Sequence, residues 1–338
     1  MINLDIYWIK VLVKTNNIKL NDFIKRYYNI FLVDKLDNID IEINLDRYWY
    51  FSKNKHLDDF SMYTTIWDDI KINFDLNKYY FKNQEIKWLV EFLDNWKILV
   101  NGFLKPRKIH HLIHILLQWF DRIDKYYNRF IIKSLMHDII FILLEKKLSI
   151  NILHATAVTN WTNTFIFTWL WWSWKSTLAS SFLSKKWYKI LSDNYCLVNG
   201  NKLYPFPELP RITKETTKLL WIEEGKKADW IKTYLNNELS WIKKEYKIDK
   251  VFICSYWNKL SINKLDDKKY IFENLFSINN YTKEFPEYLN LSLLSMINKF
   301  NTWKQRVDSL STFIENNSFY FLKNDKNIEL NLEKIENV

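Results

Sequence analysis

Residues 169–177 read W-L-W-W-S-W-K-S-T, and they lie between an apolar run at 165–168 and a stretch with helical spacing from 177. With glycine in place of each tryptophan, the segment reads G-L-G-G-S-G-K-S-T. From position 169 to position 176 it then matches the phosphate-binding loop G-x-x-x-x-G-K-[ST]. A strand before this loop and a helix after it are the context that the motif requires. The segment therefore predicts a nucleotide-binding loop if glycine occupies the tryptophan positions.

The composition supports this replacement along the whole chain. Its 338 residues include 17 tryptophans and only 3 glycines, whereas about 7% glycine, or roughly 24 residues, is ordinary for this length. Tryptophan also stands where glycine is typical, as in the turn-like pairs Asn95-Trp96 and Asn160-Trp161. We hypothesise that UGA codons, read here as tryptophan, encode glycine in the source organism. UGG codons at the tryptophans of the 169–174 loop would show that this hypothesis is wrong.

The alternative is that the tryptophans are genuine and that the loop is a hydrophobic anchor or an aromatic binding surface. A bulky residue is a conformational outlier wherever the loop needs positive φ. An indole also fills the space in which backbone N–H groups approach phosphate oxygens. We therefore expect the chain with tryptophan to bind nucleotides poorly, and the functional expectations that follow refer to the chain with glycine.

The loop motif assigns a role to each of its residues. Backbone N–H groups contact phosphate oxygens, and the positive end of the following helix strengthens that contact. Lys175 is expected to reach the β- and γ-phosphates, Ser176 to bind Mg²⁺ and Thr177 to add a phosphate contact. The expected cofactors are ATP and Mg²⁺. The predicted nucleotide-binding residues are Trp169, Leu170, Trp171, Trp172, Ser173, Trp174, Lys175, Ser176 and Thr177.

Asp193 ends the next predicted strand, in L-S-D-N at 191–194. A carboxylate at the end of a strand beside a phosphate loop is placed to bind Mg²⁺ or to accept a hydroxyl proton. The alternative is a simple turn residue, since Asp-Asn favours turns. Because of the neighbouring loop, we predict that Asp193 is catalytic and that Asp193 and Ser176 bind the metal.

Residues 150–212 resemble the catalytic domain of HPr kinase/phosphorylase and its relatives. The resemblance lies in His154-Ala155, the phosphate loop, K-K-W-Y-K-I-L-S-D-N-Y at 185–195 and L-Y-P-F-P-E-L-P-R-I at 203–212. It implies a phosphoenolpyruvate-carboxykinase-like phosphate-loop fold and ATP-dependent phosphorylation of a serine hydroxyl. It also implies that Asp193 is the general base and that His154 supports it, so the expected catalytic residues are Asp193, His154 and Lys175. Asn194 stands where the family usually has a second aspartate.

The patterns of the remaining segments predict an α/β protein with two domains. Residues 1–147 are expected to form a smaller α+β domain of unknown role, and residues 148–338 a phosphate-loop kinase domain of the HPr kinase/phosphoenolpyruvate-carboxykinase type. In the first domain we expect strands at 29–33, 39–45, 70–76 and 97–100, then helices at 108–120 and 126–146. In the second we expect strands at 152–158, 165–168, 189–192, 250–256 and 318–322, a hairpin at 195–206, and helices from 177, from 214 and over 281–305.

Weaker candidates lie outside these motifs. Glu208 and Arg211 are interpreted either as metal or phosphate contacts or as a charged elbow. His110 and His114 are four residues apart on a predicted helix that also carries His111. This spacing suits a metal, but a helix surface or a domain interface is the favoured interpretation.

Charge, cysteines and hydropathy limit the partners and the compartment. The formal charge is +10, but the lysines alternate with acidic residues, so no nucleic-acid partner is predicted. Cys196 and Cys254 form no C-x-x-C pair, which fits a reducing cytoplasm. The first ten residues resemble no signal peptide, and no apolar run approaches the ~20 residues of a membrane span. We expect a cytoplasmic protein without membrane partners, and leave homo-oligomer formation open.

These expectations combine into one main function and two alternatives. The main expectation is an ATP-dependent kinase that transfers the γ-phosphoryl group to a hydroxyl of a protein or peptide serine. One alternative is a small-molecule kinase or a carboxykinase-like enzyme on the same scaffold. The other is a non-catalytic nucleotide-binding regulatory module, which Asn194 makes plausible.

Overall fold

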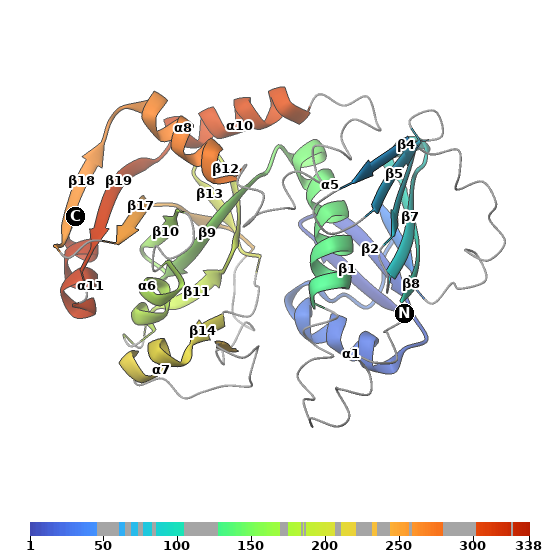
Figure 1. Cartoon of the computed structure of the whole chain (residues 1–338), viewed down its shortest axis with the longest axis horizontal. Helices are drawn as coiled ribbons and strands as arrows, with labels where there is room; N and C mark the ends of the chain where they lie inside the picture. The colour runs from blue at the N-terminus through green and yellow to red at the C-terminus, as the bar shows by residue number, and fades with distance from the viewer. Residues whose placement is uncertain are drawn as a thin grey trace. The chain divides into compact units, whose positions relative to one another are not determined.

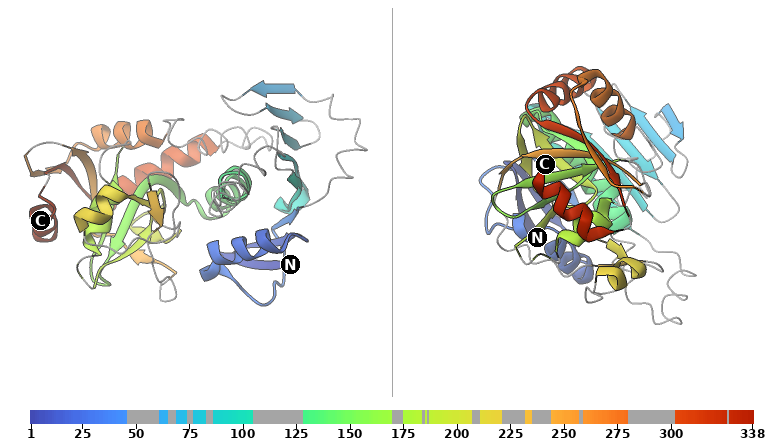
Figure 2. Two further views of the ribbon diagram at one scale, coloured as in Figure 1. Left: turned by 60° about the horizontal axis from the view of Figure 1, so that its bottom comes forward. Right: turned by 90° about the vertical axis from the view of Figure 1, so that its left-hand side faces the viewer.

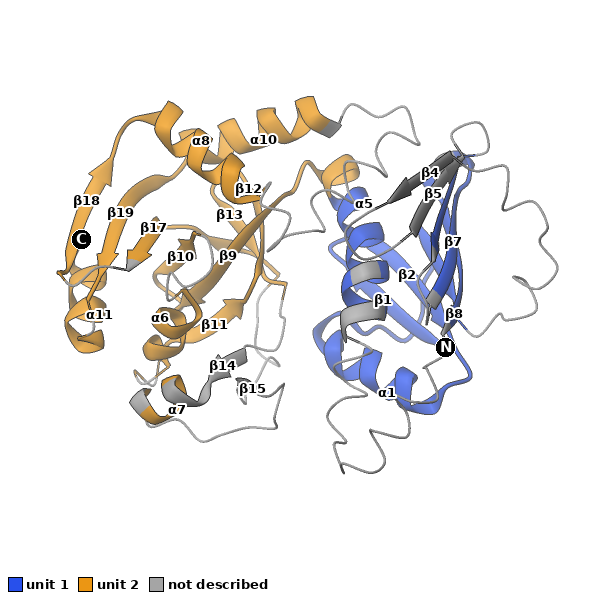
Figure 3. Cartoon of the chain, viewed as in Figure 1, with its two compact units in different colours: residues 1–144, 290–302 blue, residues 145–289, 303–338 orange. Residues whose placement is uncertain are grey.

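The structure is a computed structural model, and the chain divides into two compact units (Figure 3). Unit 1 comprises Met1–Leu144 and Asn290–Thr302, and unit 2 comprises Glu145–Leu289 and Trp303–Val338. Each unit contains a mixed sheet with helices, so the fold class is mixed α/β. The structure describes residues 1–45, 61–64, 69–73, 77–82, 86–104, 128–169, 175–183, 185, 187–206, 211–220, 232–234, 244–256, 259–279, 302–325 and 327–338.

Unit 1 is built on an eight-stranded sheet in the order β1-β2-β3-β8-β7-β6-β5-β4. Its strands are β1 (Ile2–Ile6), β2 (Ile9–Lys14), β3 (Ile41–Asn44), β4 (Ser61–Thr64), β5 (Asp69–Asn73), β6 (Lys78–Lys82), β7 (Ile86–Phe92) and β8 (Ile98–Leu104). β3 is parallel to β2 and to β8. A parallel pair needs a crossover, and the one between β2 and β3 contains α1 (Ile18–Tyr27).

One predicted strand of unit 1 is wrong. Asn29–Phe31 forms the short 3-10 helix η1, directly after α1. The buried residues of α1 are Leu20, Phe23, Ile24 and Tyr27. Their spacing is helical. The chain continues from this helix into η1, and Leu32 then pairs with Leu4 in an isolated β-bridge instead of a full strand.

The other three predicted strands and one of the two predicted helices of unit 1 fall on regular elements. Those at 39–45, 70–76 and 97–100 correspond to β3, β5 and β8. The helix predicted at 126–146 appears as a π-helical segment, η4 (Asn128–His137), continued by α5 (Asp138–Leu148). The helix predicted at 108–120, with His110, His111 and His114, lies outside the described residues.

Unit 2 is built on a nine-stranded sheet in the order β16-β13-β12-β9-β10-β17-β19-β18, with β11 also paired to β9. Its strands are β9 (Asn151–Thr159), β10 (Thr164–Thr168), β11 (Lys189–Ser192), β12 (Tyr195–Asn199), β13 (Lys202–Tyr204), β16 (Tyr246–Lys247), β17 (Lys250–Tyr256), β18 (Ser261–Leu265) and β19 (Ser318–Asn324). β10, β17 and β19 are parallel neighbours, and β9 is antiparallel to β10. All five strands predicted singly in this region and the predicted hairpin (β12 and β13) are confirmed.

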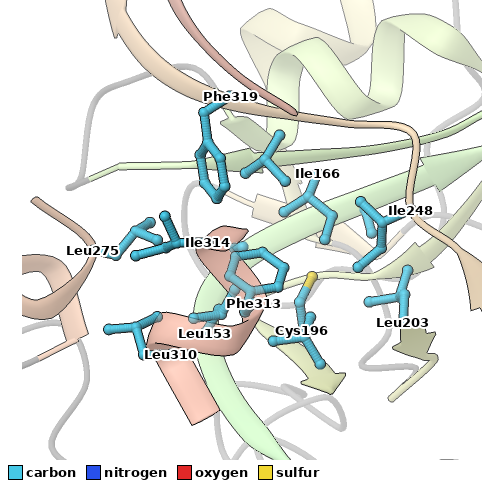
Figure 4. Packing of buried hydrophobic residues seen from close by; sticks show 14 of the residues in the cluster. Leu153, Ile166, Cys196, Leu203, Ile248, Leu275, Leu310, Phe313, Ile314 and Phe319 are labelled. Atoms are coloured by element: carbon cyan, nitrogen blue, oxygen red, sulfur yellow. The ribbon is translucent and has the colours of Figure 1, made fainter. Parts of the chain in front are cut away.

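Helices cover both faces of this sheet (Figures 1 and 2). Along a strand, successive side chains point to opposite faces. On one face, β-strand residues such as Val158 and Phe167 pack against α6 (Lys175–Phe182) and α11 (Ile328–Asn337). On the other, residues such as Leu153 and Ile166 pack against α8 (Lys268–Asn279) and α10 (Thr302–Glu315) (Figure 4). Unit 2 therefore has three layers, with a core on each side of the sheet.

Among the described residues, three tryptophans have backbone conformations that favour glycine. The φ angles of Trp8, Trp96 and Trp161 are 71°, 65° and 76°, and all three side chains are exposed. Trp8 and Tyr7, whose φ is 51°, form the two-residue turn between β1 and β2. Positive φ at both positions is typical of a type I′ turn, which prefers glycine at the second. Trp88, in contrast, is fully buried, so burial and backbone conformation separate two kinds of tryptophan position.

We predict opposite effects of glycine at these two kinds of position. Trp8→Gly should raise the free energy of unfolding by about 1 kcal/mol, because a left-handed conformation costs an L-residue about 1–2 kcal/mol and the greater chain entropy of glycine offsets part of the benefit. Trp88→Gly should lower it, because the indole stacks on Phe81 with ring centroids 4.5 Å apart and its loss leaves a cavity. Urea unfolding measures both. Trp8→Ala is the control, and equal stability of Trp8→Ala and Trp8→Gly would contradict the preference for glycine.

Candidate functional site

The predicted loop follows a buried strand and precedes a helix, as the motif requires. β10 ends at Thr168, and α6 begins at Lys175. Trp169 is partly buried and contributes to the core on the α6 face. The loop residues Leu170, Trp171, Trp172, Ser173 and Trp174 lie outside the described residues.

Asp193 lies at a buried bend between β11 and β12 and is 3% exposed. Its Oδ1 accepts a hydrogen bond from the Thr156 hydroxyl at 2.9 Å and another from the Ser176 hydroxyl at 3.0 Å. Thr156 comes from β9 and Ser176 from the first turn of α6. The two residues predicted to bind metal, Ser176 and Asp193, are therefore in direct contact, and Thr156 is a third member of the cluster.

The backbone around Asp193 is irregular. The register of β11 against β9 shifts between Ile190 and Ser192, and bulges of this kind change the direction in which side chains point. Asn194 follows with a φ of 72°, a left-handed conformation that asparagine adopts more readily than most residues. The Asn194 carbonyl accepts a hydrogen bond from the Ala155 amide at 3.3 Å. Asp193 and Asn194 are thus bend residues, as one interpretation expected, and Asp193 contacts α6 as well.

Lys175 is the first residue of α6 and is 8% exposed. Its ammonium group donates a hydrogen bond to the Trp169 carbonyl. Burial raises the pKa of the Cys254 thiol to about 12, and the positive charge of Lys175 opposes that rise. The charge of Lys175 therefore acts at β17 as well as at the end of β10. β10 and β17 are parallel, and the carboxyl ends of such strands are where open α/β sheets bind ligands.

His154 lies on β9 and is 3% exposed. It is two residues from Thr156, so its side chain is on the same face of the sheet as that hydroxyl. Its carbonyl accepts a hydrogen bond from the Thr168 hydroxyl at 3.1 Å, and its amide donates to Asn279 Oδ1 at 3.0 Å. His154 is therefore next to the last residue of β10, on the Asp193 face of the sheet.

Thr177 contacts a residue of the helix that follows α6. Its hydroxyl lies 3.3 Å from the hydroxyl of Thr216, which is buried in α7 (Lys214–Leu220). This contact ties α6 to α7. Arg211 begins β14 (Arg211–Thr213), which pairs with β15 (Lys232–Tyr234), whereas Glu208 lies outside the described residues.

The oxygen atoms around Asp193 suit Mg²⁺. This ion prefers hard oxygen ligands and is usually held by one or two carboxylates together with substrate phosphates. Asp193 and Ser176 would hold it here, with Thr156 bonded to the same carboxylate. Within the described part of the chain, no group of three or more His, Cys, Asp or Glu side chains is placed to hold a metal ion, so a magnesium site here would depend on the nucleotide for further ligands.

Comparison with known proteins adds no assignment. No protein-family model matches the chain, and the search of curated proteins finds no significant match. Among the helices that the structure describes, none has both the length and the apolar character needed to cross a membrane.

Proposed function

We propose that unit 2 is an ATP- and Mg²⁺-dependent phosphotransferase with an HPr kinase-like phosphate-loop fold, and that it phosphorylates a hydroxyl, preferably a serine of a protein or peptide. The contact between Ser176 and Asp193 carries this proposal. In the motif, the position of Ser176 supplies the hydroxyl for Mg²⁺. The structure adds a buried carboxylate at 3.0 Å from that hydroxyl, at the bend that follows β11. A hydroxyl and a carboxylate together are what a metal–nucleotide site needs.

Each residue of the cluster has a defined part in this proposal. Lys175, now bonded to the Trp169 carbonyl, would bind the terminal phosphates instead. Thr156 and Ser176 both donate to Oδ1 of Asp193, which orients the carboxylate and leaves Oδ2 for the proton of the acceptor hydroxyl. Bound Mg²⁺ would neutralise charge on the phosphates. Catalysis would rest mainly on positioning and charge neutralisation.

The first experiment compares two forms of the full chain by calorimetric titration with Mg·ATP. One form has the printed sequence, and the other has glycine at positions 169, 171, 172 and 174. We expect binding by the glycine form alone, because only a bare loop backbone lets N–H groups reach the phosphates. Absence of binding by the glycine form would contradict the proposal. Labelled ATP with a panel of proteins, peptides and small molecules then distinguishes a serine kinase from a small-molecule kinase.

Lys175→Met in the glycine form should weaken ATP binding by about tenfold or more. The methionine keeps the length of the side chain but removes a charged hydrogen-bond donor, and such bonds contribute about 1.5–3 kcal/mol. Calorimetry measures the change. Lys268→Met, at the exposed start of α8, is the control and should bind ATP as the parent does. Equal affinities of the two variants would remove the role of Lys175.

A nucleotide-binding regulatory module is the second candidate. The observation that favours it is Asn194, which replaces the second aspartate of the resembled family and whose φ of 72° belongs to a bend. Tight binding of Mg·ATP by the glycine form without transfer to any acceptor or to water would support this candidate over the kinase.

A further inference from the structure

β10 pairs with only part of β9 and leaves the first residues of β9 without a partner among the described strands on that side. The last pair joins Thr168 to Ala155, whereas β9 extends back to Asn151 beside β12. Ile152 and His154 therefore lie beyond the end of β10, and both are buried. Buried backbone N–H and C=O groups need partners, so something other than β10 must supply them at this edge.

Asn279 supplies these partners from the last turn of α8. Its Oδ1 accepts the His154 amide at 3.0 Å, and its Nδ2 donates to the Ile152 carbonyl at 3.2 Å. One acceptor and one donor are also what a residue of a neighbouring strand would offer. Asn279 is 1% exposed. After Thr168 the chain leaves the sheet toward α6, which covers one face, while α8 covers the other. The Asn279 carboxamide of α8 therefore occupies the place beside β9 where the next residues of β10 would otherwise pair.

We infer that Asn279 is a positioning residue of the candidate site. By holding His154 and Ile152 in strand geometry, it sets where the His154 imidazole lies. It also fixes the carbonyl that accepts the Thr168 hydroxyl at 3.1 Å, at the last residue before the loop. The consequence for phosphoryl transfer rests on the proposed function, whereas the placement of His154 does not.

Two variants of the full chain test the placement of His154. Asn279→Leu keeps the approximate shape but neither hydrogen bond, and Asn279→Asp keeps the acceptor for the His154 amide. The control is Asn274→Leu on the same helix, whose amide donates to the Tyr270 carbonyl at 2.7 Å. Hydrogen exchange of the His154 amide and the NMR signals of its imidazole, assigned with His154→Gln, are the measurements.

Asn279→Leu should accelerate exchange of the His154 amide roughly 10–100-fold, since a lost buried hydrogen bond favours local opening. It should also shift the imidazole signals, with smaller effects for Asn279→Asp and none for Asn274→Leu. If Asn279→Leu does not fold, Asn279→Asp must still change the imidazole signals. Parental exchange and parental imidazole signals in the variants that fold would overturn the inference.

Kinetics distinguish a positioning role from a purely structural one. In the chain with glycine in the loop, Asn279→Leu should lower kcat about tenfold or more while the Kd of Mg·ATP changes less than about threefold. The reason is that His154 lies on the Asp193 face of the sheet. In the proposed function Asp193 takes the proton of the acceptor hydroxyl, whereas the loop backbone and Lys175 bind the phosphates. An unchanged kcat in an active chain would overturn the inference. If the parent transfers no phosphoryl group, the proposed function fails, and the imidazole signals still decide whether Asn279 positions His154.

Discussion

Arg306→Met should lower the free energy of unfolding of unit 2 by about 3–5 kcal/mol, because it leaves a buried carboxylate without its counter-charge. Arg306 donates from Nε and Nη2 to the two carboxylate oxygens of Glu145, at 2.8 and 2.9 Å. The side chains are 2% and 3% exposed. The pair joins the C-terminal turn of α5 to α10, so its loss should loosen both helices. Urea unfolding followed by circular dichroism measures the change.

The control for this prediction is the exposed pair of Lys202 and Glu245, whose side chains are 50% and 47% exposed. Lys202→Met should change stability far less, since solvent screens exposed pairs. Equal effects of the two substitutions would contradict the importance of the buried pair.

The Arg306→Met variant should also become sensitive to pH. Burial raises the pKa of Glu145, and Arg306 opposes that rise. Without Arg306 the pKa of Glu145 in the folded state rises further, so the folded state binds this proton more tightly than the unfolded state. The loss of stability caused by the substitution is therefore small below the ordinary glutamate pKa. It grows as the pH rises toward and through the pKa of Glu145 in the folded state. Unfolding curves at about pH 5 and about pH 8 should differ more for the variant than for the parent.

Asp193→Asn should slow phosphoryl transfer by about 10²–10⁴-fold, which is the usual contribution of a general base. The amide oxygen of the asparagine can still accept hydrogen bonds from the hydroxyls of Thr156 and Ser176. These two bonds, at 2.9 and 3.0 Å in the parent, should therefore persist. What the variant loses is the negative charge and the ability to take a proton. Single-turnover transfer from labelled ATP, in the chain with glycine in the loop, measures the rate.

Nucleotide affinity and a matched variant complete this test. ATP binding measured without Mg²⁺ should be unchanged, because the loop backbone and Lys175 make the phosphate contacts. Asp249→Asn is the matched variant. Asp249 accepts the Thr164 amide at 2.6 Å, at the opposite end of β10, and its replacement should leave transfer intact. Full activity of Asp193→Asn would remove the catalytic role of Asp193.

The central strands of unit 2 were predictable because the sheet buries both of their faces. β9 and β10 are buried at every residue, so apolar residues occur on both faces of each strand and do not simply alternate with exposed polar ones. The helix α8 was missed, although its buried residues Ile271, Leu275 and Ile278 recur at helical spacing. β18 has no buried residue and no apolar alternation, so only its pairing with β19 makes it a strand.

The sequence by itself determined the candidate loop, Lys175, Ser176 and Asp193, because the phosphate-loop motif is contiguous and Asp193 ends the next apolar strand. Only the tertiary structure decided that Thr156 and Ser176 share one oxygen of Asp193 and that Asn279 continues the β9 ladder. Those contacts join residues far apart in the chain. They depend on strand register and on where β10 ends, and neither a threonine within an apolar strand nor an asparagine at a helix end carries a spacing signal for its partner.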